Sequence, residues 1–176
     1  MPYDPSRHHR RSIRLKGYDY SQPGGYFITI VVKNRKPILG SVVDGVFHPS
    51  RYGHLVHMVL TALPKHYPYL QLDQFVLMPD HIHAIFILLE EPRTRRTPAP
   101  KRHSVTEVIR GFKTESARKI NRLRKTQGTA VWKRNYYERI IRNQRALHAI
   151  RRYIIQNPLK WQIKQDRRFK RRASAL

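Results

Sequence analysis

The stretch Phe75-Val-Leu-Met-Pro-Asp-His-Ile-His-Ala-Ile-Phe-Ile-Leu-Leu89 decides the fold of this chain. Two apolar runs, residues 70–77 and 82–89, have the length and composition of buried strands. Met78-Pro79-Asp80 lies between them as a tight turn. Strands joined by so short a connection pair antiparallel, so the sequence predicts a central antiparallel hairpin.

Further strands and helices are predicted before and after this hairpin. Residues 26–32 are β-branched and aromatic throughout, which predicts an interior strand, and Asp44-Gly45 has the composition of a hairpin turn. Residues 130–142 have an extended pattern, and helical apolar spacing marks residues 55–63, 104–125 and 143–157. Ser104 and Glu107 have the spacing of a capping box, and Asn143 is a candidate helix cap. This order of elements predicts an α+β sandwich built on a central antiparallel sheet.

The length of the chain predicts one domain with basic extensions. A chain of 176 residues is long enough for one domain with its own core and too short for two comfortable ones. We assign residues 25–162 to this domain, with segment 91–103 as a mobile basic loop. Residues 1–24 are expected to form a basic N-terminal arm, and residues 163–176 a basic, solvated C-terminal tail.

The net charge predicts a polyanionic partner. Thirty-six Lys and Arg side chains stand against eleven Asp and Glu, a formal net charge of +25. Nucleic acid and an anionic membrane both meet such a charge. No stretch approaches the ~18 consecutive apolar residues of a spanning helix, and no signal-peptide pattern opens the chain. The sequence therefore favours nucleic acid and no membrane.

Several kinds of chemistry are excluded by absent residues and motifs. The chain has no cysteine, which excludes disulfides, zinc-thiolate sites and thiol catalysis and fits a reducing compartment. We expect a cytoplasmic protein, associated with the nucleoid when bound to DNA. No glycine-rich phosphate loop is present, so no nucleotide cofactor is expected.

His81 and His83 are the strongest candidates for a metal site. Residues two apart on a strand project from the same face, so two imidazoles can hold one ion. Taken alone, such a pair is far more often two half-exposed or hydrogen-bonded histidines that bind no metal. Tyr153 and Asn157 are one helical turn apart and should share a face. Asn157 can then complete a coordination sphere, or Tyr153 can be a core-edge aromatic and Asn157 a helix cap.

Four segments together resemble one protein family. They are Tyr18-Asp-Tyr-Ser-Gln-Pro-Gly-Gly-Tyr-Phe-Ile-Thr-Ile30, Met78-Pro-Asp-His-Ile-His83, Trp132-Lys-Arg-Asn-Tyr-Tyr-Glu-Arg-Ile-Ile-Arg142 and Arg152-Tyr-Ile-Ile-Gln-Asn-Pro158. In this order, over roughly residues 15–162, they resemble the REP-associated tyrosine transposases of the single-tyrosine HUH, or IS200-like, superfamily. The resemblance implies a small sandwich related to ferredoxin-like and RNA-recognition folds.

The resemblance also implies roles for single residues. His81 and His83 would bind a divalent metal, Mg²⁺ or Mn²⁺, Tyr153 would be the nucleophile, and Asn157 would supply a further ligand. The implied activity is metal-dependent cleavage and rejoining of single-stranded DNA at hairpin or repeat sequences, through a 5′-phosphotyrosine. Asp80 is a departure, since relatives usually have Asn there. A monomer and a homodimer both remain open.

Alternatives remain for the function and for the nucleophile. The chain can be a non-catalytic, domesticated protein that binds hairpin DNA, or a metal-dependent hydrolase that uses water. Tyr136 and Tyr137 are chemically possible nucleophiles, although packing or base stacking suits them better. The metal, Arg151, Arg152 or the substrate itself can favour the Tyr153 phenolate.

Basic side chains on the helix 104–125 are candidate DNA contacts. Each can equally be a solvated charge, so their sum carries more weight than any one of them. They are Arg110, Lys113, Arg118, Arg122 and Arg124.

Overall fold

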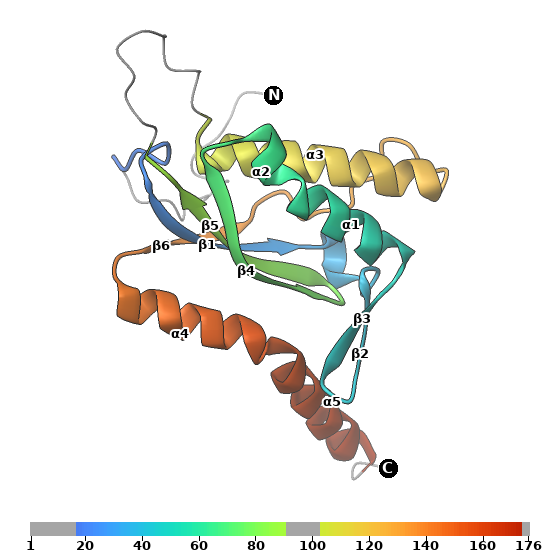
Figure 1. Ribbon diagram of the computed structural model, residues 1–176. Coiled ribbons are helices and arrows are strands. Elements are labelled where there is room, and N and C mark those ends of the chain that lie inside the picture. The colour runs from blue at the N-terminus through green and yellow to red at the C-terminus, as the bar shows by residue number, and fades with distance from the viewer. Residues whose placement is uncertain (1–16, 91–102, 174–176) are drawn as a thin grey trace, which may run out of the picture.

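A four-stranded antiparallel sheet forms the centre of the protein (Figure 1). The computed structural model describes residues 17–90 and 103–173. The strand order of the sheet is β4-β5-β1-β6, so β1 and β5 are interior. The bounds are Gly24–Val31 for β1, Leu70–Met78 for β4, His81–Leu88 for β5 and Tyr137–Ile141 for β6. A separate hairpin pairs β2 (Gly40–Val43) with β3 (Val46–Pro49).

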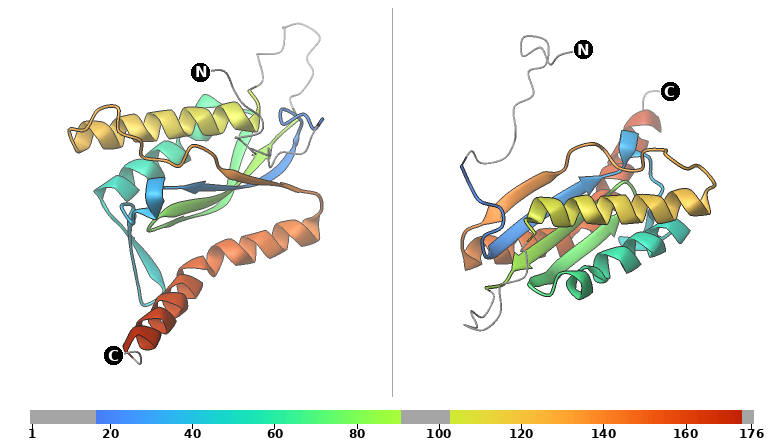
Figure 2. Two further views of the ribbon diagram at one scale, coloured as in Figure 1. Left: turned by 180° about the vertical axis from the view of Figure 1, so that it is seen from behind. Right: turned by 90° about the horizontal axis from the view of Figure 1, so that it is seen from above.

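Helices lie on both faces of this sheet, as Figures 1 and 2 show. One face carries α1 (Arg51–Thr61), α2 (Leu63–His66) and α3 (Val105–Leu123). The other face carries α4 (Gln144–Ile155), which continues after a bend into α5 (Asn157–Ala173). A short 3-10 turn, η1 (Lys33–Arg35), follows β1. None of the helices in the described ranges is long and apolar enough to cross a membrane.

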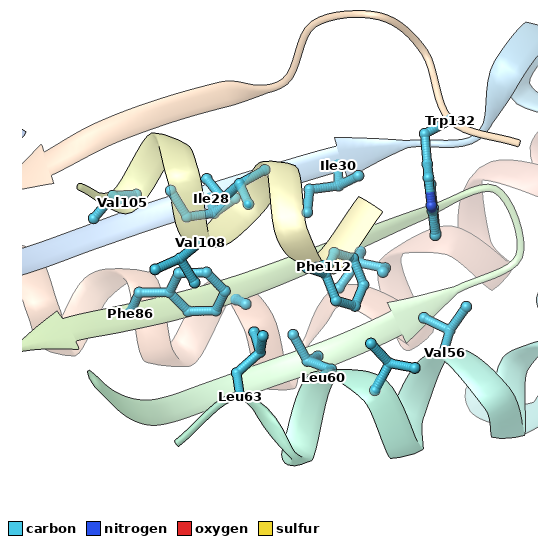
Figure 3. Close-up of a cluster of buried hydrophobic side chains, with 14 of the residues drawn as sticks. Ile28, Ile30, Val56, Leu60, Leu63, Phe86, Val105, Val108, Phe112 and Trp132 are labelled. Carbon is cyan, nitrogen blue, oxygen red and sulfur yellow. The ribbon is translucent and has the colours of Figure 1, made fainter. Parts of the chain in front are cut away.

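Strand alternation gives the two faces of the sheet different contents. On the α1–α3 face, Ile82, Ala84 and Phe86 of β5 belong to a large apolar core. On the α4 face, Ile85 packs with Ile150 and Ile154 in a much smaller cluster. The larger core buries most of the apolar surface that stabilises the fold. Figure 3 shows members of it, including Ile28, Ile30, Val56, Leu60, Val108, Phe112 and Trp132.

Most elements predicted from the sequence are confirmed. The central hairpin forms with Met78 opposite His81, and the predicted α+β sandwich on an antiparallel sheet is found. Asp44 and Gly45 both have positive φ, as a two-residue hairpin turn requires. Ser104 and Glu107 form the expected capping box of α3, and Asn143 caps α4.

Residues 163–173 of the expected C-terminal tail are helical, since they continue α5, and residues 163–167 are exposed. The helix predicted over residues 143–157 does end before Pro158, since α4 stops at Ile155. A second helix, α5, then begins, and Pro158 lies in its first turn, where the missing proline N–H costs little. Leu159 packs beside Gly45 of the small hairpin, and the Trp161 ring lies 5.8 Å from that of His81. These tertiary contacts, not a long apolar repeat, fix the helix.

The expected N-terminal arm is partly replaced by packed structure. Tyr18 and Tyr20 pack on Tyr26, with ring centroids 6.5 Å and 6.1 Å away, and β1 already begins at Gly24. The remainder of the predicted arm and most of the predicted loop 91–103 lie outside the described residues.

Gly53 tests the close contact between α1 and the chain before β2. A Cβ at this buried helical position would lie 2.1 Å from the Leu39 carbonyl oxygen, which also accepts a hydrogen bond from Ser50. Gly53→Ala should therefore lower the free energy of unfolding by roughly 1–3 kcal/mol, although alanine is the better helix former. Urea unfolding measures the change.

Gly111→Ala is the matched control on α3. Its Cβ would meet only the Tyr67 hydroxyl, at 2.9 Å, and this side chain can rotate away. The control should be as stable as the wild type or more stable. Equal stabilities for the two variants would contradict the close packing of α1.

Candidate active site

One row of side chains crosses the α4 face of the sheet. The register of β1 and β5 places Thr29 opposite His83, and that of β1 and β6 places Thr29 opposite Tyr137. Residues directly opposite each other in an antiparallel pair project from the same face. His81 follows on this face, opposite Val31. Three segments far apart in the sequence thus contribute to one surface.

The two histidines are buried and face each other. Their Nε2 atoms lie 3.1 Å apart, and the side chains are 8% and 5% exposed for His81 and His83. Each Nδ1 has its own partner: Asp80 Oδ1 at 2.5 Å from His81, and Thr29 Oγ1 at 2.8 Å from His83. Hydrogen bonds of this kind fix the orientation of an imidazole whose other nitrogen binds a metal.

This arrangement fits a divalent cation. The Asp80 carboxylate can only accept a hydrogen bond when ionised, so Nδ1 of His81 is the donor. With Nδ1 as the donor, the Nε2 lone pair of a neutral His81 faces His83 at 3.1 Å, where either an N–H of His83 or a cation between the two rings satisfies it. Within residues 17–90 and 103–173, no group of three or more His, Cys, Asp or Glu side chains is arranged to hold a metal.

Burial and charge set the protonation of the pair. Burial, together with the neighbouring His81, lowers the pKa of His83 to about 3, so this ring is neutral and able to act as a ligand near neutral pH. Burial alone would raise the pKa of Asp80. Hydrogen bonds and charges from His81 and Arg35 outweigh that effect and hold the pKa of the carboxyl below its ordinary value.

The Asp80 carboxylate bridges His81 and Arg35. Its second oxygen accepts from the Arg35 guanidinium at 3.2 Å, while its first binds His81. Arg35 itself is two-thirds exposed and has a left-handed backbone, with φ of 50°. The carboxylate is turned toward Nδ1 of His81 and orients the ring.

Tyr153 lies beside the histidines on α4. Its hydroxyl is 3.3 Å from Nε2 of His83, and the side chain is 40% exposed. The ring meets His83 edge to face at 5.2 Å, and the Lys160 Nζ lies 5.8 Å from its centroid. Ile150 and Ile154, one on each side of Tyr153 in the helix, anchor α4 to the sheet through the smaller apolar cluster.

A hollow of about 400 Å³ collects these groups. Asn157, the first residue of α5, is buried and lines it together with Tyr153, so the predicted common face of these two residues is found. The lining residues are Thr29, Val31, Arg35, His81, His83, Tyr137, Tyr153, Asn157, Lys160, Trp161 and Lys164.

Several lining residues were missed as site residues in the sequence. Lys160, Trp161 and Lys164 lie beyond Pro158, where the helix was expected to end. Thr29 carries no local signal, since only the register of β1 and β5 brings it to His83. Arg151, considered as a group that favours the Tyr153 phenolate, instead donates two hydrogen bonds to Asp73, at 2.8 and 3.0 Å. That ion pair holds α4 against β4.

The helix α3, which carries the candidate DNA-binding side chains, lies on the opposite face of the sheet from α4 (Figures 1 and 2). Lys113 donates to two backbone carbonyls, of Lys133 and Arg134. Arg118 pairs with Glu115, and Arg124 donates to Asn121. Arg110 and Arg122 are exposed. The fold does not bring these five candidate DNA contacts to the histidines.

Comparison with known proteins defines the family. The sequence model described as "Transposase IS200 like" matches residues 24–157, which include the histidines, Tyr153 and Asn157. The chain therefore belongs to the IS200-like transposase family.

Individual relatives agree with this membership. A Haemophilus influenzae strain Rd protein described as uncharacterized is 34% identical over 174 residues, 91% of this chain and 94% of that protein. A second protein of this strain, provisionally named a REP-associated tyrosine transposase, is 27% identical over 144 residues, 81% of this chain and 74% of that protein. A solved structure of a REP-associated tyrosine transposase bound to a REP hairpin shares the fold, with a TM-score of 0.61 and 18% identity over 85% of this chain and 74% of that one.

The low pKa of His83 predicts a pH-dependent stability. The folded protein keeps this ring neutral down to about pH 3, whereas the unfolded chain protonates it near 6.5. Below pH 6.5 the unfolded state binds more protons, so the free energy of unfolding of metal-free protein should fall, by about 2 kcal/mol between pH 6.5 and about pH 5. Urea unfolding of chelator-treated protein measures it.

His83→Gln should remove this part of the pH dependence. His54→Gln, at an exposed histidine of α1, is the control and should retain the wild-type slope. A His83→Gln variant whose stability falls as steeply as that of the wild type would contradict the assignment of the proton linkage to His83.

Proposed function

We propose that this protein is a metal-dependent single-stranded DNA transposase that cleaves and rejoins strands at hairpin or repeat sequences. The observation that carries the proposal is the approach of the Tyr153 hydroxyl to within 3.3 Å of His83 Nε2, beside His81. A nucleophile and a candidate metal-binding pair then share one hollow, which also exposes two lysines. Membership of the transposase family supports the same reading.

In the proposed reaction Tyr153 is the nucleophile. Its phenolic oxygen attacks the scissile phosphorus in line, the bond from phosphorus to the 3′-oxygen breaks, and that oxygen leaves as a 3′-hydroxyl after taking up a proton. The product is a 5′-phosphotyrosine. Because one phosphodiester is exchanged for another, a DNA 3′-hydroxyl can later attack this ester and rejoin the strands without ATP.

The other residues of the hollow have supporting roles. His81, His83 and Asn157 would hold Mg²⁺ or Mn²⁺, which when bound supplies charge withdrawal from the phosphate. Asp80 and Thr29 keep the two imidazoles in their orientation. The positive charge of Lys160, whose Nζ lies 5.8 Å from the Tyr153 ring centroid, offsets the negative charge of the phosphate.

A single chain is sufficient for this site. Tyr153 on α4 and the histidines on β5 come from the same chain and lie within hydrogen-bonding distance. We propose that the tyrosine serves the histidines of its own chain, so that a monomer can cleave DNA.

The preferred substrate in this proposal is a DNA hairpin with a single-stranded flank. The solved transposase that shares this fold is described as bound to a REP hairpin. The formal charge of +25 supports phosphate binding over a wide surface. The α3 face would contact phosphates away from the cleavage site, with Arg110 and Arg122 more available than Lys113, whose ammonium group is bonded to two carbonyls.

The nucleophile is tested by trapping the covalent intermediate. Wild-type protein, incubated with Mn²⁺ and single-stranded repeat hairpins from its own genome, should form a protein-DNA adduct that survives denaturing electrophoresis. Tyr153→Phe lacks the attacking oxygen and should reduce the adduct to background. Tyr67→Phe, on the other side of the sheet, should form the adduct at the wild-type level.

The other outcomes separate the competing functions. A wild type that binds the hairpins without any adduct or cleavage would indicate a non-catalytic hairpin-binding protein. If the wild type cleaves the DNA without forming an adduct, and Tyr153→Phe cleaves it equally well, the protein is a hydrolase. An adduct that persists in Tyr153→Phe would reject only the nucleophile, and Tyr137 would become the next candidate in the hollow.

Metal binding is tested by Mn²⁺ titration with electron paramagnetic resonance. His83→Ala should lower the Mn²⁺ affinity by more than about 100-fold, and Thr29→Val, which removes only the partner of His83, by roughly 10-fold. His54→Ala is the control and should bind as the wild type does. Unchanged affinity in His83→Ala would mean that the histidines are a hydrogen-bonded pair and not a metal site.

A further inference from the structure

A second hollow, of about 590 Å³, adjoins the candidate active site. It lies where β1 ends in η1 and where the chain approaches β6. Val31, Arg35 and Tyr137 line both hollows, so the two are continuous along this edge of the sheet. The remaining lining residues are Val32, Lys33, Asn34, Ala130, Trp132, Lys133 and Arg134.

The floor of this second hollow is held by backbone pairing. Lys33 donates its N–H to the Val131 carbonyl, and Lys133 donates to that of Val31, both at 2.8 Å. Trp132 is buried between them and donates from Nε1 to Ser116 Oγ at 3.0 Å. The segment that carries the basic side chains is therefore fixed to both β1 and α3.

The Lys113 side chain of α3 also holds this segment in place. Its Nζ lies 2.7 Å from the Lys133 carbonyl oxygen and 2.9 Å from that of Arg134. The backbone of these two residues is thus held by α3, while their own side chains are exposed. Lys113, a predicted DNA contact, thus also shapes a neighbouring surface.

The lining of the second hollow combines positive charge with one exposed aromatic ring. Lys33, Lys133 and Arg134 supply three cations, and Arg35 supplies a fourth that is paired with Asp80. No carboxylate side chain is among the described lining residues. Tyr137 is 54% exposed at the junction of the two hollows. Cations that follow a phosphate backbone beside an aromatic ring that stacks on a base are typical of sites for single-stranded nucleic acid.

Tyr136 differs from its neighbour, since alternate residues of a strand project to opposite faces. Its ring packs against the large core, and its hydroxyl is 3.1 Å from that of Thr106. Tyr136 is thus a structural residue, and Tyr137 is the tyrosine of this pair that is exposed where the two hollows meet.

We infer that Tyr137 and the second hollow bind the nucleotide next to the scissile phosphate, with its base stacked on the Tyr137 ring and its phosphate among Lys33, Lys133 and Arg134. Tyr137 and His83 stand on either side of Thr29 in the sheet, two strand spacings or roughly 10 Å apart. The inference rests on the proposed function, because that function puts the scissile phosphate beside His83.

The experiment compares two oligonucleotides of equal length, in a Tyr153→Phe background that cannot form the adduct. One is a fluorescent oligodeoxythymidylate, and the other is the same sugar-phosphate chain without bases. Tyr137→Val keeps a good strand former in β6 but removes the ring. It should weaken binding of the oligodeoxythymidylate by roughly 5- to 100-fold and leave the abasic chain unaffected. Fluorescence anisotropy gives both affinities.

Three further variants separate the effect of the aromatic ring on binding from that of the positive charge. Tyr137→Phe keeps the ring and should bind both oligonucleotides as the parent does. Arg134→Gln should weaken both equally and reduce the salt dependence of binding by about one phosphate contact. Phe169→Ala removes an exposed aromatic of α5 and should change neither affinity. Thermal unfolding confirms that every variant is folded.

The inference fails if Tyr137→Val lowers both affinities equally or neither. It also fails if Tyr137→Phe behaves as Tyr137→Val does, since the hydroxyl and not the ring would then be required. If Tyr137→Val is unfolded, the parent protein and Tyr137→Phe decide the question. A parent that binds both oligonucleotides equally overturns the inference. A parent that prefers the base-containing oligonucleotide, with the same preference in Tyr137→Phe, supports it. If the wild type forms the adduct but base preference does not depend on Tyr137, only the stacking site is rejected. If base preference depends on Tyr137 but the wild type forms no adduct, only the cleavage proposal is rejected.

Discussion

The antiparallel pairing of β1 with β5 is the constraint on which the other features depend. In this register Thr29 lies opposite His83 and Val31 opposite His81, while Ile28 and Ile30 point into the large core. A slip by one residue would turn the apolar side chains of β1 out of the core and remove the hydroxyl from His83. The energy of the core on one face thus fixes the geometry of the polar site on the other.

The two faces of the sheet have different roles. The α1–α3 face buries most of the apolar surface, so the α4 face can tolerate a hollow lined by two buried imidazoles, with a buried carboxylate behind one of them. Burying such groups is unfavourable unless each has a partner. Asp80, Thr29 and Arg35 provide those partners, which makes the surroundings of His81 and His83 as important as the histidines themselves.

Patterns that depend on neighbouring residues were predicted well. The turn at Met78-Pro79-Asp80, the Asp44-Gly45 hairpin and the caps at Ser104 and Asn143 follow from local backbone chemistry, and all are found. The continuation of α5 past Pro158 was missed because proline ends a helix from within yet is accepted in a first turn. Charge alone selected Lys113 as a DNA contact, although its ammonium group is bonded to carbonyls.

The sequence by itself determined that this is an α+β protein with a central hairpin, a strong positive charge and a histidine pair on one strand face. Alternation along a strand and apolar spacing along a helix are local properties, and the sequence carries them directly. Only the tertiary structure decided that Thr29, Tyr137 and Lys160 lie around that pair, and that the α3 cations do not. Strand register and the packing of α5 against the small hairpin join residues that are distant in the chain, so no local pattern reports them.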